Sequence, residues 1–352
     1  MVSAFAPGRV ELLGNHTDYN EGLVLGAAID RGITVSGAVR TDDRLCLDSN
    51  SFGRAEIRLT DLEPSEVARW ANYSFGVARE LIDLGVPVKG ADAKVEADLP
   101  PRAGLSSSAA FEIATALFLL ELSDRELSAM AIAKLCQRAE HRFVGVRSGL
   151  MDQVMSQFGR ADHLILFDTR SEEIRLIPFP TELSLIIANT GKERELTKGE
   201  YNARREQTLA AAKSLGIRAL RDVNSASLDE ADLEPLLKQR ARHVVGENER
   251  VLRAVEYLGA GDAAAFGGLL NQSHESSREN FENSTPELDL LVQLAQKQPG
   301  VLGARLTGAG FGGAIVALCQ RDRAEAVADT LRKSDSAREV FVCKIAAGAR
   351  LL

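Results

Sequence analysis

This sequence contains few cysteines and few aromatic residues, and it has no excess of positive charge. Only 4 of the 352 residues are cysteines, and aromatic residues make up 5% of the chain. Scattered cysteines, with no CxxC pair and no histidine cluster beside them, indicate reduced thiols and argue against a zinc site. The formal net charge is −8, so no basic face is evident and we expect no nucleic-acid partner.

Long apolar runs are missing as well. The sequence opens on a short β-like run, with no charged segment leading into an apolar stretch, and no run is long enough to span a membrane. We therefore expect a cytoplasmic protein with no membrane partner, and nothing in the sequence indicates a protein partner. Hydrophobic residues make up 45% of the chain, which is ample for a core, and the length suggests two domains.

Strand-like and helix-like segments are interleaved along the chain, which predicts an α+β fold. Expected strands are residues 2–6, 10–13, 23–29, 34–39, 44–47, 91–97, 163–167, 174–177, 183–188, 303–307, 313–318 and 339–344. Expected helices are residues 64–84, 109–117, 127–143, 149–158, most of 200–258, 261–275, 286–297 and 322–333. The apolar strand at 183–188 is expected to open the second domain.

The most informative stretch is the turn Arg102-Ala103-Gly104-Leu105-Ser106-Ser107-Ser108, between an expected strand and an expected helix. Small residues let the backbone approach a ligand closely, and the free N–H groups and dipole of a helix N-terminus favour an anion. The three serines add hydroxyls for phosphate oxygens or for Mg²⁺. A phosphate-binding loop and a serine-capped helix after a tight turn both explain the pattern.

A second polar stretch, residues 8–22, lies between two expected strands. It carries an arginine, a histidine, an aspartate and two asparagines, which suit a ligand with many hydroxyls because each hydroxyl needs a partner once water is displaced. A solvated loop accounts well for Asn20-Glu21-Gly22, but less well for Arg9 and His16.

Two acids further along the chain could complete a phosphoryl-transfer site, which needs a cation and a carboxylate near the acceptor hydroxyl. Mg²⁺ prefers oxygen ligands, so Ser108 and Glu140 are candidate ligands. Asp152 could take the acceptor proton or orient the hydroxyl. On spacing alone, an exposed helix acid at Glu140 and a first-turn acid at Asp152 are the simpler explanations.

A glycine-rich stretch, residues 306–313, separates two apolar runs. It does not fit the dinucleotide fingerprint, because a strand follows it where a helix should. The chain also lacks GxxxxGK[ST], so it is not a P-loop enzyme. Residues 306–313 by themselves predict a β-hairpin turn.

Together these three segments closely resemble those of the GHMP small-molecule kinases, and among them the galactokinases. Residues 8–20 resemble the family's sugar-binding signature, residues 104–109 its phosphate loop, and residues 306–313 its third motif. Shorter similar stretches follow in family order over nearly the whole chain: 69–73, 139–141, 151–153, 200–201, 240–245 and 286–289.

The resemblance implies a two-domain GHMP kinase fold with the active site in the cleft. Residues 1–180 would form a mixed β/α domain with a left-handed βαβ unit, and residues 181–352 a C-terminal α/β sandwich of ferredoxin-like type. The implied reaction is ATP-dependent phosphorylation of the C1 hydroxyl of a monosaccharide, D-galactose in the first place, with Mg²⁺ as cofactor.

The resemblance also assigns roles to individual residues. Asp152 would lie beside the anomeric hydroxyl, and Arg9 near Asp152 and the transferring phosphoryl group. Residues carried over as sugar contacts are Asn15, His16, Asp18, Gly149 and Tyr201. Residues carried over as ATP contacts are Trp70 at the adenine and Arg102, Ala103, Gly104, Leu105, Ser106, Ser107 and Ser108 at the phosphates, with Ser108 and Glu140 serving Mg²⁺.

Two departures from the family pattern bear on the substrate. Asn15 stands where the family has a glutamate that accepts a hydrogen bond from the C6 hydroxyl. Asparagine loses the charge and gains a donor, so we expect weaker galactose binding or a different tolerance at C6. Arg102 replaces the first glycine of the phosphate loop, and either contacts phosphate or faces solvent.

Three functions therefore compete. A galactose 1-kinase comes first, followed by a related sugar 1-kinase with altered C6 specificity because of Asn15. A sugar-binding regulator without turnover is disfavoured, because Arg9, Ser108, Glu140 and Asp152 are all present. The sequence leaves open the oligomeric state, the anomer, and whether Asp152 removes the proton or positions the hydroxyl.

Overall fold

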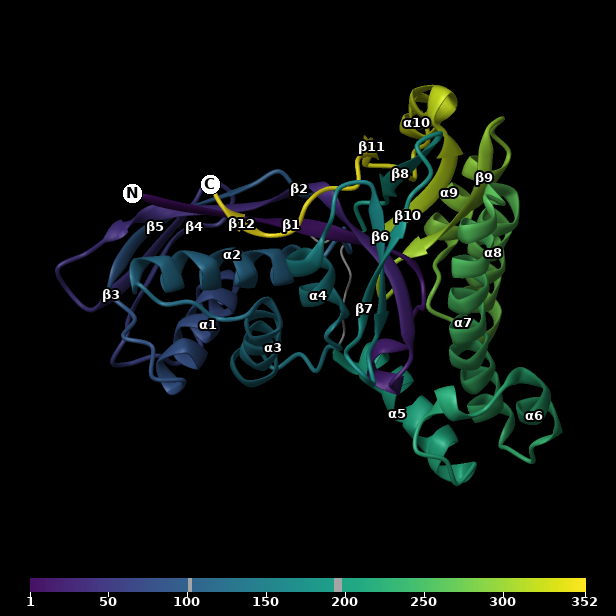
Figure 1. The fold of residues 1–352 in the computed structure, drawn as a ribbon, viewed down its shortest axis with the longest axis horizontal. Helices are drawn as coiled ribbons and strands as arrows, with labels where there is room; N and C mark the ends of the chain where they lie inside the picture. Colours follow the sequence, from purple (N-terminus) through teal and green to yellow (C-terminus); the bar gives the residue numbers. More distant parts are fainter. Residues whose placement is uncertain (101–102, 193–197) are drawn as a thin grey trace.

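The first half of the chain, together with the last strand, forms an eight-stranded sheet with helices packed against it (Figure 1). The computed structural model describes residues 1–100, 103–192 and 198–352. The strand order is β12-β1-β2-β5-β3-β4, and β6 pairs with both β2 and β7. The strands of this sheet are β1 (Val2–Leu13), β2 (Leu23–Val39), β3 (Arg44–Ser49), β4 (Gly53–Arg58), β5 (Ala91–Ala97), β6 (His163–Asp168), β7 (Ile174–Pro178) and β12 (Arg350–Leu351).

The helices of the first half centre on α2, which is apolar on nearly all sides. Of its 16 residues, 12 are buried, as expected for a helix enclosed between a sheet and other helices. This burial holds the N-terminus of α2 in a rigid position. The helices are α1 (Asn72–Asp83), α2 (Ser107–Leu122), α3 (Ala129–Ala139), the π-helical turn Glu140–Val144 and α4 (Met151–Phe158).

The second half is built on a four-stranded antiparallel sheet, β11-β8-β10-β9. Successive side chains of a strand point to opposite faces. Accordingly, Leu185 and Ile187 join the large core cluster, whereas Ile186 and Ala188 pack with α9 and α10. The elements are β8 (Leu183–Asn189), α5 (Lys198–Ser214), α6 (Ser225–Glu230), α7 (Pro235–Ala260), α8 (Ala263–Ser276), the π-helical turn Ser277–Phe281, α9 (Pro286–Gln296), β9 (Val301–Thr307), β10 (Ala314–Gln320), α10 (Ala324–Arg332) and β11 (Glu339–Cys343).

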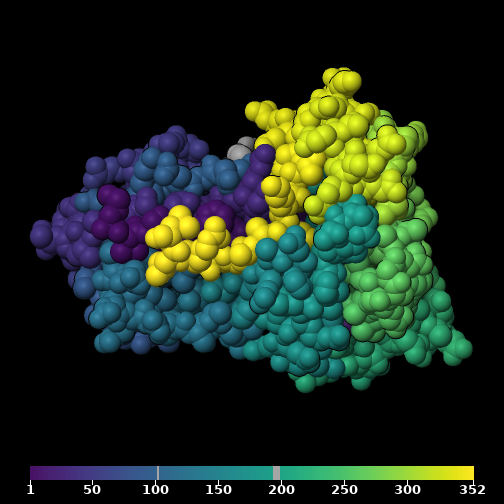
Figure 2. Space-filling view, turned by 45° about the horizontal axis from the view of Figure 1, so that its top comes forward, coloured from purple at the N-terminus to yellow at the C-terminus, as the bar shows by residue number. Residues whose placement is uncertain are grey.

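One hydrophobic cluster joins the two halves, beside smaller clusters within each half. The shared cluster includes Ala4 of β1 and Val316 of β10 and extends to Ile345. The C-terminal residues also return to the first sheet, where β12 pairs with β1 through Ala4↔Leu351 and Phe5↔Arg350. Figure 2 shows this yellow segment lying along the purple first strand. The domain boundary at residue 180 stays a prediction.

Most expected elements are present, but one expected helix is too long. The segment expected as a helix from residue 64 forms α1 only from Asn72. The Asn72 side chain accepts a hydrogen bond from the Ser65 N–H and donates one to its carbonyl, which holds the preceding residues as a loop. Strand β4, which lies at the edge of the sheet and is mostly exposed, was not predicted. Among the described residues, no helix is both long and apolar enough to cross a membrane.

Candidate active site

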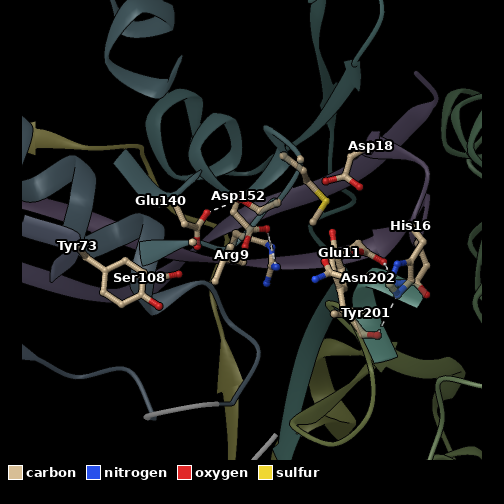
Figure 3. Close-up of a pocket in the computed structure, with 17 residues that line it drawn as sticks. Arg9, Glu11, His16, Asp18, Tyr73, Ser108, Glu140, Asp152, Tyr201 and Asn202 are labelled. Atoms are coloured by element: carbon tan, nitrogen blue, oxygen red, sulfur yellow. Dashed lines mark hydrogen bonds and ion pairs between the residues drawn. The ribbon is translucent and has the colours of Figure 1, made fainter. Parts of the chain in front are cut away.

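One cavity collects most of the residues singled out in the sequence. It has a volume of about 180 Å³, opens to solvent, and is lined by parts of β1, α1, α2, α4 and α5 with the loops beside them (Figure 3). A concave site with several polar side chains converging on it is typical of small-molecule binding. The sequence-predicted residues that line it are Arg9, Asn15, His16, Asp18, Ser108, Glu140, Gly149, Asp152 and Tyr201.

Arg9 joins three parts of the cavity wall. It donates to Asp152 Oδ1 from Nε at 2.9 Å and lies 2.6 Å from the same oxygen through Nη2, while Nη1 donates to the Gly104 carbonyl at 2.6 Å. The ion pair therefore fixes α4 relative to the loop before α2. The Arg9 side chain is 4% exposed, whereas Asp152 is 27% exposed and lies open to the cavity.

A bulge in β1 makes this arrangement possible. The sequence predicts two short strands here, but β1 runs through Pro7, with a register shift between Pro7 and Arg9. Proline has no N–H to donate, which favours a bulge at that point. A Cβ on Gly8 would lie 2.7 Å from the Leu105 carbonyl, which accepts a hydrogen bond from the Arg9 N–H. The absence of a side chain at Gly8 thus lets β1 reach the loop that precedes α2.

The loop before α2 has a backbone shaped for a close ligand. Gly104 and Ser106 have φ values of 76° and 58°, in the left-handed region. The Ser106 side chain makes no capping hydrogen bond to the first N–H groups of α2. Its buried hydroxyl has no hydrogen-bond partner among the described residues. The first N–H groups of the helix are therefore available to an anion. Of the three serines, Ser108 lines the cavity.

Glu140 is a buried acid and not the exposed helix carboxylate that spacing alone suggests. It begins the π-helical turn after α3 and is 6% exposed. Its Oε2 accepts hydrogen bonds from Ser148 and, at 3.3 Å, from Gln153. Burial, with a smaller contribution from the charge of Asp152, raises the pKa of Glu140 to about 7. A nearby cation would favour the ionised form.

Asp18 is a second cavity acid with a raised pKa. Burial is the main cause, and the charges of Asp152 and Glu11 add to it, so that the pKa reaches about 7. Asp18 lies so close to Gly149 that a Cβ there would come within 1.8 Å of Asp18 Oδ2. The absence of a side chain at Gly149 therefore makes this close contact with Asp18 possible.

The glycine-rich turn between β9 and β10 supports the sugar-signature loop from behind. The Gly308 carbonyl accepts a hydrogen bond from Asn15 Nδ2 at 2.8 Å, and the Ala309 carbonyl lies 3.0 Å from His16 Nε2. His16 Nδ1 also lies 2.7 Å from the Tyr19 hydroxyl. The hairpin turn expected from residues 306–313 thus supports a loop nearly 300 residues away in sequence.

Buried charges anchor the same loop to α7. Glu247 accepts hydrogen bonds from the N–H groups of Gly14 and Asn15, at 2.8 and 2.9 Å. Burial alone would raise the pKa of Glu247, but Arg250 and Arg305 outweigh it and hold the pKa well below its usual value. Arg250 donates to Glu247 Oε1 at 2.7 Å. The second half of the chain therefore sets the position of the first motif.

Some predicted nucleotide contacts lie elsewhere. Trp70 does not line the cavity but packs between Phe52 and Phe111, with ring centroids 5.8 and 6.0 Å away. Its contact with adenine stays a prediction. Arg102 lies outside the described residues. Ala103 and Leu105 are buried, so only their backbone groups can serve a ligand.

Four polar residues of the cavity were not predicted as site residues from the sequence: Glu11, Tyr73, Ser148 and Asn202. Each is a neighbour of a quoted motif. Glu11 lies inside the signature, Tyr73 ends the stretch 69–73, and Asn202 follows Tyr201. Alternation along β1 would have indicated Glu11, because residues i and i+2 of a strand share a face.

Comparison with known proteins agrees with this geometry. Three family models match: the galactokinase galactose-binding signature at residues 2–39, the GHMP kinase N-terminal domain at 72–160 and the GHMP kinase C-terminal domain at 254–337. A galactokinase of Mannheimia succiniciproducens is 42% identical over 99% of this chain and 94% of its own length.

Solved structures agree as well. A Lactococcus lactis galactokinase crystallised with galactose superposes with a TM-score of 0.95 at 34% identity, covering all of this chain and 95% of its own. A mevalonate kinase shares the fold, with a TM-score of 0.70 at 20% identity, over 98% of this chain and 99% of its own. The three motifs, their meeting in one cavity and these full-length similarities place the chain in the GHMP kinases, as a member of the galactokinase family.

Proposed function

We propose that the protein transfers the γ-phosphoryl group of ATP to the C1 hydroxyl of D-galactose, giving galactose 1-phosphate and ADP. The observation that carries this proposal is the Arg9–Asp152 ion pair. It joins the loop before α2, where an anion can bind, to the wall of a hydroxyl-binding cavity. The 42% identity to a galactokinase over nearly the whole chain supports the same reaction.

Asp152 is the residue we assign to the acceptor hydroxyl. Arg9 engages its Oδ1, which leaves Oδ2 to accept a hydrogen bond from the C1 hydroxyl. Arg9 orients the carboxylate and can offset the negative charge that builds up during transfer. Holding the hydroxyl in line with the phosphoryl group supplies much of the catalysis in reactions of this class.

Ser108 and Glu140 are the residues we assign to Mg²⁺. Both line the cavity, both offer oxygen, and Glu140 Oε2 is held by Ser148 and Gln153. Two protein oxygens suit Mg²⁺, which keeps several waters and takes further ligands from substrate phosphates. When bound, the ion would neutralise phosphate charge. We call Arg9, Ser108, Glu140 and Asp152 the phosphoryl end of the cavity.

The opposite part of the cavity is where we place the sugar. Figure 3 shows Glu11, His16, Asp18 and Tyr201 grouped on the other side of Arg9 from Ser108. We call these residues, with Asn15, the sugar end. Acid oxygens can accept hydrogen bonds from sugar hydroxyls, and the aromatic rings shield them from water.

A panel of sugars tests the function. Purified protein is given ATP and Mg²⁺ with D-galactose, D-glucose, D-mannose or 6-deoxy-D-galactose, and ADP release is followed. We expect galactose to be turned over with kcat on the order of 1–100 s⁻¹. A strong preference for another hexose would establish the related 1-kinase instead, and binding without ADP release would establish a regulator.

The same proposal covers the surroundings of the enzyme. All four cysteines are free and buried. This suits a reducing compartment, and together with ATP as the phosphoryl donor it favours the cytoplasm. The boundary near residue 180 would separate the half that contains the phosphoryl end from the half that supports the sugar loop.

A further inference from the structure

We propose that Glu11 is the acidic residue that accepts hydrogen bonds from the sugar hydroxyls farthest from C1. Asn15 holds Glu11 in position and does not itself contact the sugar. The inference rests on the proposed function. It concerns which of two neighbouring side chains determines specificity, a question raised by the asparagine that replaces the family's glutamate at position 15.

Asn15 has little hydrogen-bonding capacity left for a ligand. Its Nδ2 donates to Glu11 Oε1 at 2.9 Å and to the Gly308 carbonyl at 2.8 Å, which uses both amide hydrogens. Its Oδ1 accepts from Asn283 at 3.0 Å. The residue is completely buried. Breaking any of these contacts to bind a sugar would leave a buried polar group without a partner, which is costly.

Glu11 is held in place from several sides. Its backbone N–H donates to Thr307 Oγ1 at 2.9 Å, and its carbonyl accepts from the same hydroxyl at 3.1 Å. The Oε1 atom of Glu11 accepts the hydrogen bond from Asn15 Nδ2 and lies 3.1 Å from Arg305 Nη1. The other carboxyl oxygen has no partner among the described residues, and Glu11 lines the cavity. A fixed carboxyl with one oxygen available is well suited to hydroxyl recognition.

The position of Glu11 on β1 indicates how far its carboxyl lies from Arg9 and Asp152, where the transfer takes place. Arg9, Val10 and Glu11 pair in regular register with Ala28, Ala27 and Gly26, so the strand alternates normally here. Val10 is in the core, and Arg9 and Glu11 therefore face the cavity together. Residues i and i+2 are about 6.6 Å apart along a strand, roughly the length of a hexose. If C1 lies at Asp152 beside Arg9, the C4 or C6 hydroxyl lies at Glu11.

The experiment compares sugars that lack one hydroxyl. KM and kcat are measured for D-galactose, 4-deoxy-D-galactose and 6-deoxy-D-galactose with the wild type and with Glu11→Gln. We expect the variant to raise KM for galactose roughly 10- to 100-fold. KM for the one deoxy sugar that lacks the contacted hydroxyl should hardly change, and neither should KM for ATP. That selective change identifies the hydroxyl, and a purely structural role would not produce it.

Two further variants keep the test decisive. Glu80→Gln changes a carboxylate that is equally buried but lies outside the cavity, where it pairs with Arg138 and Arg142. It should leave the ratio of KM values between the sugars unchanged. The exchange Glu11→Asn with Asn15→Glu keeps one carboxyl and one amide in the pair. It should recover none of the sugar affinity lost in Glu11→Asn alone, because the carboxyl then stands at a buried position that does not contact the sugar. Asn15→Glu alone sets two carboxyls side by side and should weaken binding.

Each failure has its own meaning. If the wild type phosphorylates galactose but Glu11→Gln leaves all three KM values unchanged, or raises them equally, the inference about Glu11 is wrong and the proposed function stands. If the wild type phosphorylates no sugar and binds no galactose by calorimetry, both fall. Should Glu11→Gln not fold, the folded exchange variant decides, because galactose affinity equal to that of the wild type would show that a carboxyl at position 15 can bind the sugar and would overturn the inference.

Discussion

The two ends of the cavity are built from different parts of the chain. The phosphoryl end is made by residues between Arg9 and Asp152, on β1, α2, α4 and the π-helical turn. The sugar end consists mainly of residues 11–18, which also belong to the first half of the chain. Residues of the second half hold this segment in place: Glu247, Asn283 and the turn at 308–309. Changes in the second half of the chain should therefore affect sugar binding and leave the phosphoryl end intact.

The largest effect should come from the phosphoryl end. Asp152→Asn keeps the shape of the side chain but removes the carboxylate beside the acceptor hydroxyl. We expect kcat to fall roughly 10²- to 10⁴-fold, with nucleotide affinity nearly unchanged. Steady-state kinetics and nucleotide titration check this. Asp162→Asn, at an exposed acid outside the cavity, is the control. Turnover within a few-fold of the wild type would rule out the role given to Asp152.

The buried support of the sugar loop should give the next largest effect. Glu247→Gln leaves Arg250 without its buried counter-charge and removes one of the two carboxylates beside Arg305. Loss of one partner of a buried pair costs about 3–5 kcal/mol of unfolding free energy. Denaturant unfolding measures this loss, and KM for the sugar should rise more than KM for ATP. Glu256→Gln, exposed on the same helix, is the control. An equal rise in both KM values would contradict the division between the two ends.

Gly149 tests the contact between the loop that precedes α4 and the sugar-signature loop. Gly149→Ala places a methyl group against the carboxylate of Asp18, which must move. Overpacking of this kind costs about 1–3 kcal/mol, and we expect most of it to appear as weaker galactose binding measured by calorimetry. In Gly259→Ala the new methyl group meets no neighbour within 4 Å, so this variant should bind galactose as the wild type does. Unchanged galactose affinity in Gly149→Ala would mean that Asp18 does not contact the sugar.

The smallest effect concerns pH and the metal. The raised pKa of Glu140, about 7, means that the folded protein favours its protonated form. Its contribution to stability is therefore complete below about pH 4.5 and lost as the pH rises through 7. Mg²⁺ needs the ionised form, so the affinity for Mg²⁺–ADP should rise roughly tenfold from pH 6 to 8. Chelation of Mg²⁺ or Glu140→Gln should flatten this dependence in calorimetry; a dependence that persists in Glu140→Gln would assign the titration to another group.

The local pattern of the chain predicted much of the fold. Strand β5 was predicted at its observed bounds, and β6, β7, β8 and α9 to within about two residues at each end. Such segments are correctly predicted because their apolar periodicity and their turn residues are local properties. The start of α1 was predicted eight residues too early, because a side-chain contact of Asn72 overrides the helical pattern before it.

The site divides in the same way. The sequence by itself determined the serine turn, the polar signature and the acids at 140 and 152, since their residue types already fit phosphate, hydroxyls and a cation. Only the tertiary structure decided that Arg9 bridges Asp152 and Gly104, that Glu140 is buried, and that Glu11 and not only Asn15 lines the cavity. These facts depend on a strand bulge and on contacts across 95 to nearly 300 residues, and no local propensity encodes a contact at that separation.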